Sequence, residues 1–133
     1  MMAKPFGRAI AIWLLLMAAE VVHGIARTLW LTPIVGDFRA RQIAVFSGSL
    51  LIVTITTITV RWLHAPGARA LWAIGLLWVT LTLAFEIGLG RFVFGFSWNR
   101  LASDYNLRAG GLLPIGLLVM AMAPWLAARL RGA

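Results

Sequence analysis

Three ionisable side chains that could share one site are Glu20, His23 and Arg27. Their spacing of three and four residues would place them on one face of a helix. Glu20 and Arg27 would then lie two turns apart, roughly 10 Å along the axis, with His23 between them. These groups could form a polar binding site or a proton relay, because imidazole titrates near neutral pH. The same residues could instead form an internal network that joins this helix to its neighbours.

A second acid, Glu86, falls in another apolar part of the chain. On a helix it would share a face with small residues that let a neighbouring helix approach closely: Gly75, Thr82 and Gly90. Arg91 would fall almost opposite Glu86, whereas Arg27 would sit at about the right depth to meet it. We therefore predict a salt bridge between Glu86 and Arg27 that links two helices. Glu20 and His23 would lie one or two turns deeper.

The composition and the apolar runs of the sequence indicate which helices hold these ionisable residues. Of the 133 residues, 62% are hydrophobic, whereas soluble domains contain about 45–50% apolar residues. A soluble chain of this length could not bury so much apolar surface. Four apolar runs, at about residues 9–31, 43–63, 70–92 and 112–128, come close to the roughly 20 residues that cross a bilayer as a helix.

Only helices and closed barrels satisfy the backbone in lipid, and the short alternating segments of a barrel are missing from this sequence. We therefore predict an all-α fold, an integral membrane four-helix bundle that forms a single domain over residues 1–133. Hydroxyl groups in the second run, such as Ser47 and Thr54, are expected to bond to the backbone and to assist packing.

An even number of spans places both termini on the same side of the membrane. The cations are divided equally between the two sides, so the positive-inside rule decides little. Lys4 and Arg8, which precede the first run, favour cytoplasmic termini. The first run continues to Leu31 and is too long for the core of a signal peptide, so we expect an uncleaved span. The predicted location is a bacterial-type inner membrane, which the chain crosses several times.

The side opposite the termini combines arginines, aromatic residues and an acid near one interface. This pattern is typical of the belt that anchors a bundle, but it could also form a pocket for an anionic head group. The candidate ligand-binding residues are therefore the polar centre and this rim: Glu20, His23, Arg27, Glu86, Arg91, Trp98, Arg100, Asp104, Tyr105 and Arg108.

Several functional classes are disfavoured. Cysteine is absent, which excludes disulfides, thiolate metal sites and a cysteine nucleophile. The net charge of +8 comes from cations at the ends of apolar runs, where they meet lipid phosphates, so no nucleic-acid partner is expected. Glu20 and His23 form one Glu-x-x-His pair, whereas di-iron bundles need two such pairs and two further acids. We expect no metal and no cofactor, identify no catalytic residue, and lean against an enzyme.

Ala19-Glu20-Val21, in the first of four short spans, resembles the small multidrug resistance exporters. The resemblance implies that Glu20 would be a proton and substrate site. His23 and Arg27 on the same face depart from that pattern, because a cationic substrate would meet a cation.

The favoured function is the binding of an amphiphilic, anionic ligand, such as a lipid head group, a lipid-linked intermediate or a quinone. The polar centre would orient the polar end of the ligand, and the rim arginines would recruit its charge. One alternative is an accessory structural subunit of a larger membrane complex. Another is a proton-coupled small exporter that acts as a dimer. Membrane lipids are the expected partners in every case, with a homodimer or a larger complex as further options.

Overall fold

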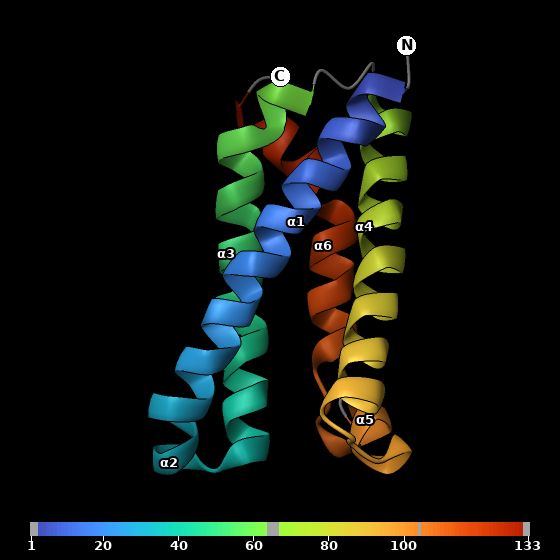
Figure 1. The fold of residues 1–133 in the computed structure, drawn as a ribbon. Helices are drawn as coiled ribbons and strands as arrows, with labels where there is room; N and C mark the ends of the chain where they lie inside the picture. Colours follow the sequence, from blue (N-terminus) through green and yellow to red (C-terminus); the bar gives the residue numbers. More distant parts are fainter. Residues whose placement is uncertain (1–2, 64–66, 104, 132–133) are drawn as a thin grey trace.

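The computed structural model describes residues 3–63, 67–103 and 105–131, and within these ranges the chain forms helices and no strands (Figure 1). In chain order the elements are α1 (Ala3–Ala26), the π-helical η1 (Arg27–Leu31), α2 (Thr32–Val35), α3 (Asp37–Leu63), α4 (Ala68–Gly88), the π-helical η2 (Leu89–Val93), α5 (Trp98–Ser103), the 3₁₀-helical η3 (Leu107–Ala109) and α6 (Leu113–Arg131).

The described part of the chain contains four helical stretches that are long and apolar enough to cross a membrane: Phe6–Val35, Asp37–Leu63, Ala68–Val93 and Leu113–Arg131. They coincide with the four predicted runs and extend beyond several of them, because the polar and cationic residues at the ends of the runs are also helical. By helix length and hydropathy the chain is a multi-pass membrane protein. The predicted all-α bundle is confirmed.

The beginning of α1 and the end of α6 lie at the same end of the bundle, here called the terminal end (Figure 1). The opposite end, here called the distal end, carries α2 and α5. The prediction that both termini share one side is therefore confirmed.

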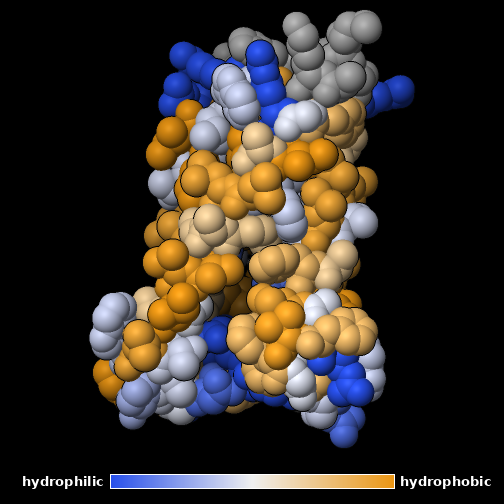
Figure 2. All heavy atoms as spheres, in the orientation of Figure 1, coloured by the Kyte–Doolittle hydropathy of each residue, from blue (hydrophilic) through white to orange (hydrophobic). Residues whose placement is uncertain are grey.

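Helix α1 is oblique to the rest of the bundle. It starts beside α4 at the terminal end and crosses in front of α6 toward α3 at the distal end (Figure 1). Its stretch Phe6–Val35 contains 30 residues. At 1.5 Å per residue this is roughly 45 Å, against a hydrocarbon core of about 30 Å, so a tilted course is expected. As a result α1 and α4 diverge toward the distal end, and Figure 2 shows a hollow there with hydrophilic residues at its floor.

The core lies where α1, α3, α4 and α6 meet. Trp78 is fully buried, and its indole Nε1 donates a hydrogen bond of 2.8 Å to the backbone carbonyl of Ala9. Trp13 Nε1 donates to Thr82 Oγ1 at 3.0 Å, and this hydroxyl in turn lies 3.2 Å from Met120 Sδ. The polar atoms of these three side chains therefore find partners on other helices, in a medium that offers none.

The face of small residues predicted on the third span does permit close helix contact, and α6 is the helix that approaches it. Gly75 is buried, and a Cβ added there would overlap the backbone carbonyl of Ala121. Large apolar side chains point outward instead, including Leu14, Leu50, Leu76 and Leu118. Figure 2 shows apolar residues over the middle of the molecule and hydrophilic residues at both ends, as expected for a lipid-facing surface.

Arginines lie over aromatic rings at both ends of the bundle. At the terminal end these pairs are Arg8 with Trp62 and Arg129 with Trp125. At the distal end they are Arg41 with Phe38, Arg91 with Trp98 and Arg100 with Phe96. Cation–aromatic pairs of this kind suit the two membrane–water interfaces, where an amphipathic ring and a charge both find favourable surroundings.

Candidate functional site

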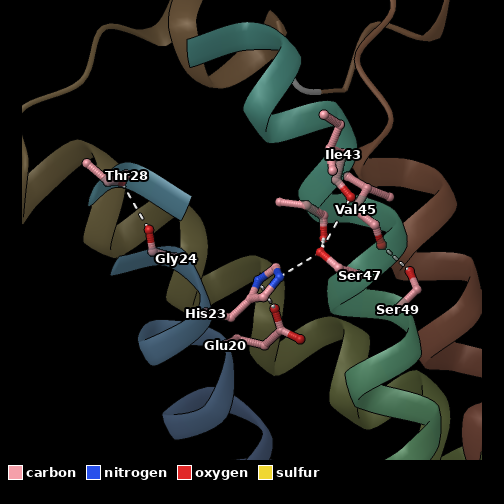
Figure 3. Close-up of polar contacts among 9 residues, drawn as sticks. Glu20, His23, Gly24, Thr28, Ile43, Val45, Ser47 and Ser49 are labelled. Atoms are coloured by element: carbon pink, nitrogen blue, oxygen red, sulfur yellow. Dashed lines mark hydrogen bonds and ion pairs between the residues drawn. The ribbon is translucent and has the colours of Figure 1, made fainter. Parts of the chain in front are cut away.

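The imidazole of His23 joins α1 to α3 (Figure 3). Its Nε2 lies 2.7 Å from Ser47 Oγ, and its Nδ1 lies 3.8 Å from Glu20 Oε2. The predicted arrangement of Glu20 and His23 on one helix face is thus present, one turn apart and in contact. Ser47 is the residue that the sequence did not identify as part of this group. Its hydroxyl, expected to serve packing, also lies 3.5 Å from the carbonyls of Ile43 and Ala44.

The carboxyl group of Glu20 rests against α3 at Gly48. A Cβ at Gly48 would lie 3.0 Å from Glu20 Oε2, so the missing side chain makes room for the acid. The Oε1 atom of Glu20 is buried and has no hydrogen-bond partner among the residues that the structure describes. Glu86 of α4 acts electrostatically on the same carboxyl group. The carboxyl groups singled out in the first and third apolar runs therefore lie within electrostatic range of each other.

Arg27 is the first residue of η1, one turn beyond His23, and its cation acts electrostatically on the imidazole. Its Nε is buried and makes no hydrogen bond to any described residue. The predicted salt bridge between Arg27 and Glu86 stays a prediction. A guanidinium with an unused buried donor next to apolar side chains has the capacity to bind an additional acceptor.

A pocket of about 270 Å³ opens between α1, η1 and α3. This volume lies just below the roughly 300–1,000 Å³ that ligand sites occupy. The pocket has three polar lining residues, His23, Arg27 and Ser47, and four apolar ones, Ala26, Trp30, Leu31 and Ala44. Nothing in the sequence distinguished Trp30 or Ala44 from other apolar residues, because their role depends on the crossing of two helices.

The arginines of the distal rim form contacts with the protein itself. Arg91 donates to the carbonyl of Phe96 at 3.2 Å and lies 5.0 Å from the centre of the Trp98 ring. Arg100 lies 3.5 Å from the carboxylate of Asp37, so α5 is held to the beginning of α3.

Asp37 also forms an ion pair of 3.1 Å with Arg41. Tyr105 is partly buried and Arg108 is exposed, whereas Asp104 lies outside the described residues. None of the rim residues appears in the lining of the pocket between α1, η1 and α3. Of the predicted site residues, His23 and Arg27 line the pocket, whereas Glu20 contacts His23 without lining it.

Helices α1 and α4 end in the same unusual way. Each passes into a π-helical segment of five residues, η1 beginning at Arg27 and η2 containing Arg91. Such segments are rare and are often found at functional sites, because they turn side chains away from the positions of a regular helix. Nothing in the sequence indicated either π-helical segment.

Within the described ranges, no group of three or more His, Cys, Asp or Glu residues is placed to hold a metal ion. The polar groups that line the pocket are a guanidinium, an imidazole and a hydroxyl, beside an apolar wall. Comparisons with protein family models, with curated proteins and with solved structures find no significant match.

Proposed function

We propose that this multi-pass membrane protein binds an amphiphilic, anionic ligand in the pocket between α1, η1 and α3. The observation that carries the proposal is Arg27, a pocket residue whose buried Nε has no partner among the described residues. A buried donor without an acceptor costs free energy, of the order of 1–3 kcal/mol or more for a charged group. An anion bound beside the guanidinium would remove that cost.

The walls of the pocket indicate the kind of anion. Trp30 and Leu31 offer apolar surface directly beside Arg27, and Trp30 is 70% exposed on the outer face of the bundle. A ligand with a charged head and a hydrocarbon tail would match both the guanidinium and the apolar wall, with its tail remaining in the lipid. The guanidinium favours a phosphate or carboxylate head group, as in an anionic lipid or a lipid-linked intermediate, over a neutral quinone.

Native mass spectrometry of the gently solubilised protein tests this proposal. We expect the wild-type protein to retain an anionic lipid-like molecule and the Arg27→Ala variant to lose it. Arg39→Ala is the matched control, because Arg39 is an exposed arginine in α3 and does not line the pocket. Equal retention by all three proteins, or no retained molecule in any of them, would contradict the proposal. Recovery only with a second polypeptide would favour an accessory subunit.

A further inference from the structure

The hydrogen bond between His23 and Ser47 can form with the imidazole either neutral or protonated, without movement of either side chain. With neutral imidazole, the Ser47 hydroxyl can donate to His23 Nε2 across the 2.7 Å separation. With protonated imidazole, Nε2 donates to Ser47 Oγ, and the hydroxyl hydrogen can turn to the carbonyls of Ile43 and Ala44 at 3.5 Å. A hydroxyl is both a donor and an acceptor, so the bond survives in either direction.

The charges around His23 come from two helices. Within α1, Glu20 lies 3.8 Å from Nδ1, and Arg27, the first residue of η1, acts electrostatically on the ring. From α4, Glu86 acts on Glu20. The residues of α3 that meet this group, Ser47 and Gly48, are uncharged. Helix α6 has no ionisable residue before Arg129.

An anion bound beside Arg27 would change the electrostatic balance between neutral and protonated His23. Without a ligand, a proton on His23 is attracted by Glu20 and repelled by Arg27. An anion paired with Arg27 cancels the repulsion and adds an attraction, because both residues line the same pocket. Electrostatic effects of this kind are strong in surroundings that exclude water.

We propose that an anionic ligand enters the pocket together with a proton, which is held on His23 between Glu20 and Ser47. The inference rests on the proposed function, since it concerns the same pocket. Binding and protonation are then reciprocal, so the affinity for an anion rises as the pH falls.

The test uses the full chain in mild detergent and a fluorescent alkyl sulfonate with a twelve-carbon tail as the probe. A sulfonate keeps its charge across the whole pH range, so a change in affinity reports on the protein. We expect the wild type to bind the probe about tenfold more tightly at pH 5.5 than at pH 8, within the usual range of coupling between two sites. His23→Gln, which can keep a hydrogen bond to Ser47, should bind with little dependence on pH.

A second measurement needs no variant. Calorimetric titration of the wild type at pH 7 in buffers of different ionisation enthalpy should show proton uptake, up to one proton per bound probe. Binding without proton uptake and with the same affinity at each pH would overturn the proton linkage and leave the pocket intact. A pH dependence that persists in His23→Gln and disappears in Glu20→Gln would overturn it too, by placing the proton on Glu20. Binding that Arg27→Ala leaves unchanged would instead contradict the proposed function.

Discussion

Gly75 of α4 and Ala121 of α6 meet backbone to backbone, because a Cβ at Gly75 would overlap the Ala121 carbonyl. We expect Gly75→Ala to force the two helices apart and to lower the free energy of unfolding by about 1–3 kcal/mol, the usual cost of overpacking. Gly88→Ala is the matched control, since it lies in the same helix and a Cβ there meets nothing within 4 Å. Titration with a denaturing detergent would measure the free energy of unfolding of both variants. Equal values would show that the close approach of α4 and α6 is not required for stability.

The hydrogen bond from Trp78 to Ala9 joins α4 to α1 in the fully buried core. Trp78→Phe removes the donor and part of the buried ring, and we expect it to cost about 1–3 kcal/mol of stability. Trp72→Phe provides the comparison, because Trp72 is 38% exposed and stacks on Trp125. Thermal unfolding followed by circular dichroism should give a clearly lower melting temperature for Trp78→Phe than for Trp72→Phe. The reverse order would contradict the assigned core.

Gly48 makes room for the carboxyl group of Glu20. Gly48→Ala should displace this flexible group by a few tenths of an ångström, change global stability by less than about 1 kcal/mol, and alter the surroundings of His23. The imidazole nitrogen shifts in an NMR spectrum would report the change. Gly24→Ala serves as the control, because a Cβ there has open space around it. Identical His23 signals in both variants would argue against the contact between Glu20 and α3.

Asp37 links α3 to α5 through Arg100, and its side chain is 51% exposed. Because such pairs contribute little, Asp37→Asn should lower global stability by only about 0.2–1 kcal/mol. Its effect should be local, with faster amide hydrogen exchange in α5 and unchanged exchange in the core of α4. Unchanged exchange in α5 would mean that the ion pair does not hold this short helix in place.

The sequence predicted the spans because lipid imposes a length and a composition that few other environments require. Helical periodicity also placed Glu20 and His23 together, since both lie within a regular stretch of α1. The position assigned to Arg91 relative to Glu86 depended on a straight α-helix, and η2 interrupts that helix between them. Ser47 and Trp30 could not be assigned to a site, because only the crossing of α1 and η1 with α3 brings them to one pocket.

The first membrane-crossing stretch has 30 residues and the last has 19, and both belong to one bundle. Neither can change its length, so a difference from the bilayer thickness is accommodated by tilting of the longer stretch or by local deformation of the lipid. A change in the tilt of α1 would change the separation of α1 and α4 at the distal end, where these helices diverge.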